Sequence, residues 1–116
     1  FPMDQVDTVL KEVGLPSEVL EKRARELSGG QLQRVCIART LLLNPDIIIF
    51  DESLSGLDPK TQVQILQLLY KIHGKYQNTF IFIAHDEQLC RAICDRTLIL
   101  ENGQFTRELQ DVAEAT

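Results

Sequence analysis

The sequence predicts an α/β fold: parallel strands with helices between them, and a β-hairpin near the C-terminus. Two observations lead to this prediction. Segments with helical spacing of apolar residues alternate with two runs rich in β-branched and aromatic residues, 47–50 and 79–84, which are typical of buried parallel strands. The segment 97–106 carries apolar runs on both sides of Asn102-Gly103, a strong signal for a two-residue hairpin turn.

The first part of the chain is predicted to be helical. Apolar residues fall on one helical face over 4–13, and Gly14 ends that helix. Ser17 is the expected cap of a short helix that begins at Glu18. A longer helix is expected over 28–44, where it stops because the residue before a proline avoids helical backbone angles.

Strands and helices alternate in the rest of the chain. The run over 47–50 is predicted to be a strand buried on both faces, and 79–84 a second one. Asp58 and Pro59 supply an N-cap and a first-turn proline for a helix that runs toward Gly74. A last helix, opening at the aspartate after the second strand, precedes the hairpin.

Composition sets the broad class. The 116 residues fit one small domain, and the 44% apolar and 25% charged fractions are those of an ordinary globular protein. A net charge of −5 argues against nucleic acid as the main partner, because phosphate binding needs clustered basic residues. The three cysteines lack metal-site spacing, which suits a reducing cytosol. Cys90 and Cys94, near His85, share an apolar helix face, which favours packing over metal binding.

Ser28-Gly29-Gly30-Gln31 opens the helix expected over 28–44. A capping box, in which the first and fourth residues satisfy each other's backbone donors, explains Ser28 and Gln31. It does not explain the two glycines, which each cost about 1 kcal/mol of helix stability relative to alanine. Glycines at a helix start let an anion approach backbone N–H groups at the positive end of the helix dipole. A helix start that faces a phosphate is therefore the better interpretation.

Two adjacent carboxylates, Asp51 and Glu52, close the strand run over 47–50. Ligands of open α/β sheets bind beyond the carboxyl ends of the strands, where these residues are expected. One carboxylate could hold Mg²⁺ through water and the other could orient an attacking water. The alternative is a polar strand end that leads into a turn.

Two further residues have ordinary structural interpretations. Asp58 before Pro59 is a good helix N-cap without any other role. His85 follows the second strand, and a single histidine is more often structural than catalytic. Its expected position, level with Asp51 and Glu52 on a nearby strand, favours a functional role.

In sequence order, four segments together resemble the second half of an ABC ATPase cassette: Leu27 to Arg34, Ile47 to Glu52, Ser55 to Asp58, and His85. The resemblance covers nearly the whole chain and implies the C-terminal part of a P-loop NTPase (RecA-like) domain. It implies one incomplete domain, in which 1–44 end the helical subdomain and 45–116 form the core and hairpin. The segments 15–23 and 31–39 are similar to the peptide/nickel branch of bacterial importers.

The resemblance also implies roles for single residues. Glu52 polarises the hydrolytic water and His85 senses the γ-phosphate, as the catalytic pair. Asp51 supports Mg²⁺ through water. The residues expected to contact ATP, or to lie at the seam with a second cassette, are Ser28, Gly29, Gly30, Gln31 and Asp58.

The sequence departs from the family pattern at one decisive point. No Gly-x-x-x-x-Gly-Lys-Ser/Thr segment occurs in it, so the Walker A loop that cradles the phosphates is missing. We therefore expect the chain by itself to bind and hydrolyse ATP poorly. The first residues, Phe1-Pro2, suggest a shortened chain or a broken reading frame.

The parent protein is expected to be an ATPase that uses ATP and Mg²⁺ to import a peptide, nickel or a metal chelate. Its expected partners are a second cassette, membrane permease subunits and, indirectly, a solute-binding protein, with no nucleic acid. It would lie on the cytoplasmic face of the bacterial cell membrane. The alternatives are a non-catalytic, self-associating fragment, and an ABC ATPase that acts on nucleic acid or the ribosome.

Overall fold

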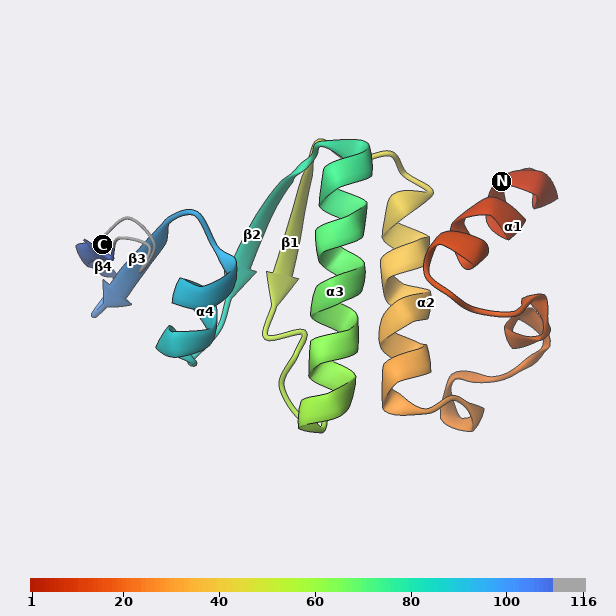
Figure 1. Cartoon of the computed structure of the whole chain (residues 1–116), viewed down its shortest axis with the longest axis horizontal. Coiled ribbons are helices and arrows are strands. Elements are labelled where there is room, and N and C mark those ends of the chain that lie inside the picture. The colour runs from red at the N-terminus through yellow and green to blue at the C-terminus, as the bar shows by residue number, and fades with distance from the viewer. Residues whose placement is uncertain (110–116) are drawn as a thin grey trace. The chain divides into compact units, whose positions relative to one another are not determined.

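The computed structural model describes residues 1–109 and forms two compact units, residues 1–81 and residues from 82 onward. The α/β order predicted from the sequence is confirmed (Figure 1). No helix in the described part of the chain is long and apolar enough to cross a membrane. The elements in order are α1 (Met3–Glu12), η1 (Ser17–Glu21), η2 (Ala24–Glu26), α2 (Gly29–Leu41), β1 (Ile47–Asp51), α3 (Pro59–Tyr76), β2 (Thr79–Ile83), α4 (Glu87–Ile93), β3 (Thr97–Glu101) and β4 (Gln104–Leu109).

The strands β1 and β2 are neighbours in a two-stranded sheet and run in the same direction, as predicted (Figure 1). The N–H of Thr79 donates to the carbonyl of Asp46 at 2.8 Å, where both strands begin. The rings of Phe50 and Phe80 meet edge to face at 5.1 Å, and the ring of His73 meets Phe80 in the same way. Aromatic contacts therefore join the two strands and tie the start of β2 to α3.

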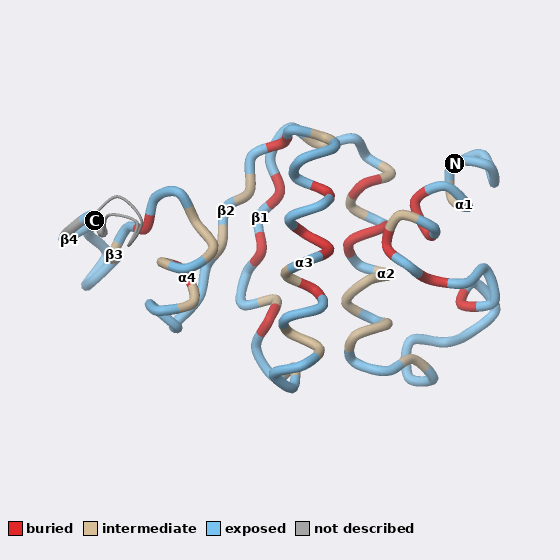
Figure 2. The backbone as a smooth tube through the Cα atoms, in the orientation of Figure 1, coloured by how far each residue is buried: buried red, intermediate tan, exposed pale blue. Residues whose placement is uncertain are grey.

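One part of the core of residues 1–81 lies between one face of β1 and the helices α2 and α3, and a second part is formed by buried residues on and after α1 (Figure 2): Val9, Leu10, Val13, Leu15 and Val19. Ile48 and Phe50 are the buried residues of β1. The buried side chains from the two helices include Ile37, Ala38, Leu41, Ile65, Leu68, Leu69 and Ile72. Helix α3 supplies the larger share because its apolar residues recur at helical spacing.

The prediction that both strands are buried on both faces is wrong. β1 alternates between exposed and buried residues, and Ile47 and Ile49 are 57% and 62% exposed. On β2, Ile81 is 44% exposed. A run of β-branched residues reports the apolar character of a strand, but not how many of its faces other elements cover. Within the described residues, this sheet leaves isoleucine side chains on its outer face.

Several predicted boundaries also differ. Helix α2 ends at Leu41, three residues before the predicted end, and β1 extends one residue further, to Asp51. The segment after Pro16 is a 3-10 helix that begins at Ser17, and that side chain caps nothing. Helix α3 runs through Gly74 to Tyr76 and ends at Gln77, which has a left-handed φ of 56°. β2 ends at Ile83, one residue before the predicted end.

Long-range polar contacts hold α1 against the other helices. The guanidinium of Arg34 on α2 donates to the carbonyl of Val13 at 2.6 Å, just beyond the end of α1. The ammonium of Lys75 lies 2.5 Å from the carboxylate of Glu12, which also accepts the hydroxyl of Tyr76. Burial raises the pKa of Glu12, but the hydrogen bonds from Lys75 and Tyr76, together with the charges of Lys75 and Lys71, outweigh it and lower that pKa overall. Burial and then the bond to Glu12 raise the pKa of Tyr76 to about 12.

The second unit contains α4 and the predicted hairpin. Asp86 caps α4 by accepting the N–H of Leu89 at 3.0 Å. β3 and β4 pair antiparallel around Asn102 and Gly103, both of which have positive φ angles, 52° and 78°. Positive φ at both central residues is what a type I′ turn requires, so the hairpin prediction is confirmed. The last seven residues of the span predicted for this core, 110–116, lie outside the described residues.

Candidate functional site

The start of α2 contains the predicted capping box. The hydroxyl of Ser28 accepts the N–H of Gln31 at 3.1 Å, and the amide oxygen of Gln31 accepts the N–H of Ser28 at 3.1 Å. The donors in this box are the backbone N–H groups of Ser28 and Gln31. The N–H groups of Gly29 and Gly30 belong to the first turn of the helix and are not used by it, so they remain at the positive end of the helix dipole.

Gly29 lies beside the segment that leads into α3, and Gly30 lies beside the first turn of α3. A Cβ atom added at Gly30 would lie 2.9 Å from Cγ2 of Thr61, and one at Gly29 would lie 3.5 Å from Cδ2 of Leu57. The first distance is too short for two carbon atoms, whereas the second is an ordinary contact. Sequence reasoning missed this close approach, because nothing in the local pattern indicates which neighbour faces a helix start.

The predicted carboxylates lie at the end of β1. Asp51 is the last residue of the strand, and Glu52 follows it with a left-handed φ of 54°. Both residues are exposed. Left-handed backbone is costly for a residue other than glycine, by about 1–2 kcal/mol, and it recurs at functional sites. The carbonyl of Glu52 accepts the N–H of Ser55 at 3.1 Å, which fixes the turn that leads to α3.

Asp51 and Glu52 suit a magnesium ion that takes its other ligands from phosphate and water. Mg²⁺ prefers oxygen donors and is usually held in phosphate sites by one or two carboxylates. No group of three or more His, Cys, Asp and Glu side chains among residues 1–109 could hold a metal by itself. The donor set therefore fits a metal that arrives with a phosphate, rather than a metal caged by protein alone.

Asp58 caps α3, as the sequence predicts. Its carboxylate accepts the N–H of Thr61 at 3.2 Å and the hydroxyl of Thr61 at 2.5 Å. These hydrogen bonds, the hydroxyl first, lower the pKa of Asp58 below its ordinary value. The cap interpretation is confirmed, and the position of Asp58 at a seam with a second cassette stays a prediction.

The predicted residues of the first unit gather at one end of it. α2 and α3 lie side by side and run in the same direction (Figure 1). β1, which follows α2 and precedes α3 in the chain, runs in the opposite direction. The carboxyl end of β1 therefore points toward the end at which both helices begin. This end carries Ser28 to Gln31, Asp51 and Glu52, and Asp58.

His85 belongs to the second unit. It is exposed and lies between the end of β2 and the cap of α4, Asp86. Its position after a parallel strand is as the sequence predicts. Its predicted place level with Asp51 and Glu52 stays a prediction.

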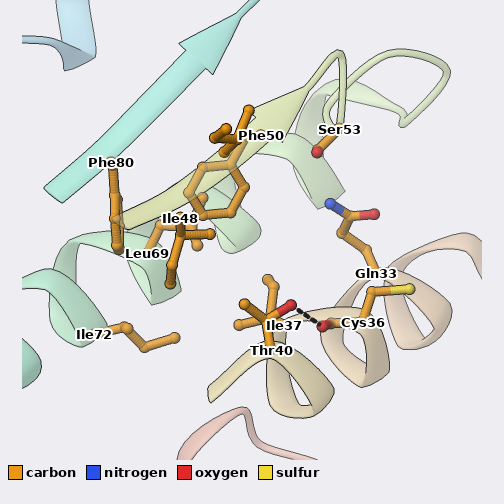
Figure 3. A pocket seen from close by; sticks show the side chains of 11 residues that line it. Gln33, Cys36, Ile37, Thr40, Ile48, Phe50, Ser53, Leu69, Ile72 and Phe80 are labelled. Atoms are coloured by element: carbon orange, nitrogen blue, oxygen red, sulfur yellow. Dashed lines mark hydrogen bonds between the residues drawn. The ribbon is translucent and has the colours of Figure 1, made fainter. Parts of the chain in front are cut away.

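A cavity of about 160 Å³ lies between α2, β1 and α3 (Figure 3). Its wall is mostly apolar and includes Ile37, Ile48, Phe50 and Leu69. No predicted site residue lines it. Because small-molecule pockets usually enclose about 300–1,000 Å³, this cavity is a packing space rather than a nucleotide pocket.

Comparison with known proteins agrees with the predicted family. The family model described as "ABC transporter" matches residues 2–55. The chain is 43% identical over 105 residues to the metal-staphylopine import system ATP-binding protein CntF of Staphylococcus aureus, covering 90% of this chain and 42% of that protein. It is 43% identical over 106 residues to the nickel import ATP-binding protein NikE of Escherichia coli, covering 91% and 39%.

Solved structures show the same fold. The chain superposes on cbiO1 from Clostridium perfringens, part of the ABC transporter complex cbiONQ, with a TM-score of 0.84 and 30% identity. That match covers 99% of this chain and 47% of the other. A dimeric ATP-binding cassette in a post-hydrolysis state, bound to ADP and Pi, gives a TM-score of 0.76 and 36% identity over 92% of this chain and 46% of that one.

The chain spans about 40% of the length of the curated relatives it matches. The matched part has the α/β order, the parallel strand pair and the C-terminal hairpin that the sequence predicts. The sequence identity and the superposed fold point to the same group of proteins. The chain has the fold of the C-terminal part of an ABC ATPase cassette, and about 90% of its sequence is similar to ABC transporter ATP-binding proteins.

Proposed function

We propose that these residues form the signature, Walker B and switch-histidine part of the ATP-hydrolysing subunit of an ABC importer. The proposal rests on the arrangement of residues at the end of the first unit where α2 and α3 begin. An exposed carboxylate pair follows a parallel strand there, beside a glycine-rich helix start with two first-turn N–H groups outside the capping box. Negative groups that bind a metal and positive helix ends that bind phosphate are both needed for phosphoryl chemistry.

Two carboxylates divide the chemistry in this proposal. Glu52 accepts a proton from the attacking water, or orients that water, at the γ-phosphate. Asp51 supports Mg²⁺, which supplies charge neutralisation at the phosphate oxygens when it is bound. Glu52 has left-handed backbone directly after β1, and strained backbone of this kind recurs at functional sites.

The remaining predicted residues act on phosphate or across a pair of cassettes. His85 senses the γ-phosphate of the same nucleotide as Glu52. The start of α2 offers its N–H groups to ATP held by the opposite cassette, and Asp58 lies at the seam. The residues at the start of α2 in this role are Ser28, Gly29, Gly30 and Gln31. The amide oxygen of Gln31 is engaged in the capping box, so its amide NH₂ is the part that remains for a ligand.

The relatives narrow the proposed cargo. Their names include nickel import and metal-staphylopine import. We infer import of nickel or a metal chelate, with a peptide as the wider alternative. The proposed assembly contains a second cassette and membrane permease subunits on the cytoplasmic face of a bacterial membrane, with a solute-binding protein acting through the permease.

Glu52→Gln tests the proposed base. Residues 1–116 are joined to the Walker A half of the Escherichia coli nickel import ATP-binding protein, and ATP turnover is measured. The variant is expected to lose at least about a hundred-fold in kcat, in the range of general acid–base catalysis, while ATP still binds. Glu18→Gln, at an exposed glutamate of η1, is the matched control and should turn over normally. A chimera that binds ATP without hydrolysing it, or a fully active Glu52→Gln variant, would contradict the proposal.

The chain alone should bind ATP weakly, because it carries no Walker A segment. A titration of residues 1–116 with a fluorescent ATP analogue is expected to give no saturation in the micromolar range. Micromolar affinity would show that phosphate binding here does not depend on a Walker A loop.

A second candidate rests on a different observation. Ile47, Ile49 and Ile81 leave an apolar face of the sheet exposed. Such faces favour association, so residues 1–116 by themselves could be a non-catalytic, self-associating fragment. Light scattering across a concentration series tests this candidate, which predicts a molecular mass that rises with concentration.

A further inference from the structure

We propose that Thr61 is a positioning residue: its methyl group sets how closely the glycine-rich start of α2 approaches α3, and residue 30 is glycine because of that contact. The usual reason for glycine at a helix start, the approach of an anion to the backbone, does not require any particular neighbour. Here a neighbour occupies the space that a side chain at residue 30 would need.

The contact is specific to one of the two glycines. A Cβ at Gly30 would meet Cγ2 of Thr61 at 2.9 Å, a distance at which one atom must move. A Cβ at Gly29 would meet Cδ2 of Leu57 at 3.5 Å, and the flexible end of a leucine could adjust further. Packing on α3 therefore requires glycine at residue 30 but not at residue 29.

Thr61 cannot easily yield. A β-branched side chain has few χ1 rotamers in a helix, and its hydroxyl here is fixed at 2.5 Å from the carboxylate of Asp58. The same carboxylate accepts the N–H of Thr61 at 3.2 Å. Turning the methyl group away from Gly30 would break the hydroxyl bond to the cap of α3. The cap of one helix thus holds the surface on which the other helix begins.

The consequence for the site concerns the N–H groups of Gly29 and Gly30. Hydrogen-bond donors at a phosphate act only when they are held within about 0.5 Å of the required place. A methyl group in contact with Gly30 fixes the distance between the start of α2 and the segment after Glu52. This step rests on the proposed function, because the exact position of the N–H groups matters only if they contact a phosphate.

A double-mutant cycle on residues 1–116 tests the contact without any nucleotide. Gly30→Ala is expected to lower the ratio of folded to unfolded protein at least about five-fold, because it overfills the interface. Thr61→Ser removes Cγ2 and keeps the hydroxyl, so it should change that ratio little. The double variant Gly30→Ala/Thr61→Ser should recover most of the loss. An equal loss from Gly30→Ala in both backgrounds would overturn the proposal.

A direct distance measurement covers the case in which Gly30→Ala does not fold. In the unsubstituted chain, a nuclear Overhauser effect is expected between the α-protons of Gly30 and the methyl protons of Thr61. The α-protons of Gly74 on α3 have no atom in the corresponding position and serve as the control. Absence of the Gly30–Thr61 signal in a folded chain would also overturn the proposal.

The positioning role is tested in the ATPase chimera described above. Gly30→Ala should lose at least about ten-fold in kcat with little change in KM, and Thr61→Ser should restore most of it. If packing is restored in the double variant but turnover is not, the positioning role is wrong and Gly30 serves the ligand directly. A chimera without any ATPase activity would contradict the proposed function, and the stability cycle would still decide the contact.

Discussion

The helices α2 and α3 have similar N-caps but differ in the two residues that follow the cap. In each, a polar side chain accepts the N–H of the residue three positions later, Ser28 from Gln31 and Asp58 from Thr61. Between these positions α3 carries Pro59 and a lysine, which suit a first helical turn. α2 carries two glycines, which are poor helix formers.

The difference separates two kinds of constraint. The capping positions follow from the needs of any helix end, whose first N–H groups require partners. The positions between them follow from what lies outside the helix. Gly30 of α2 is partly buried and a Cβ there would clash with Thr61, whereas Pro59 and Lys60 of α3 are exposed. The cap can therefore be explained from within α2, whereas the glycine at residue 30 is explained by a neighbour outside it.

Asp58→Ala should have the largest effect on this pair of helix starts. The variant loses the cap of α3 and also frees the hydroxyl of Thr61, so the contact with α2 loosens. The folded-to-unfolded ratio from urea titration is expected to fall roughly ten-fold. Asp58→Asn keeps a good capping side chain and is the control. If the two variants were equally destabilised, the carboxylate would matter through its charge rather than through capping.

Ser28→Ala should have a smaller effect, about 1 kcal/mol, because it removes one cap and frees no other side chain. The same urea titration measures it. Ser17→Ala is the matched control, since Ser17 begins a 3-10 helix without capping it and should cost little. A larger loss for Ser28→Ala than for Asp58→Ala would reverse the comparison.

Gly29→Ala is expected to stabilise the chain by roughly 0.5–1 kcal/mol, the opposite sign to Gly30→Ala. Alanine is the better helix former, and its Cβ would make only an ordinary contact with Leu57. Thermal unfolding of the two variants side by side is the measurement. Destabilisation of both would mean that the whole start of α2 is packed too closely for any side chain.

The pH dependence should be the smallest effect. The pKa of Asp58 lies below its ordinary value of 3.8 in the folded chain, so its contribution to stability is present above that value. It is lost as the pH falls through the lowered pKa. Because the group is exposed, solvent screens the effect. Stability measured from pH 6 down to pH 2 should fall less steeply in Asp58→Asn, and Ser28→Ala should keep the original slope.

Sequence reasoning succeeded where the cause of a structure is local. The capping box at Ser28 and Gln31, the cap at Asp58 and the hairpin turn at Asn102-Gly103 depend on residues within a few positions of one another. Each of them is present. The order of elements was predictable for the same reason, since apolar period and breaker residues act within one segment.

It failed where the cause lies elsewhere in the chain. The exposed face with Ile47 and Ile49 depends on how many elements cover the sheet. The contact of Gly30 with Thr61 and the bonds of Glu12 to the end of α3 join positions that are 31 or more residues apart in sequence. No local pattern encodes such pairs, and only the assembled helices bring them together.

The hydrogen bond from Arg34 to the carbonyl of Val13 has a consequence for protein engineering. It joins the two ends of the segment between Val13 and Arg34, so the middle of that segment lies far from the bond. The free energy of closing a loop rises by only about 0.6 kcal/mol for each doubling of its length. We therefore expect that a segment inserted just before η2 (Ala24–Glu26) would leave the hydrogen bond between α2 and the end of α1 in place.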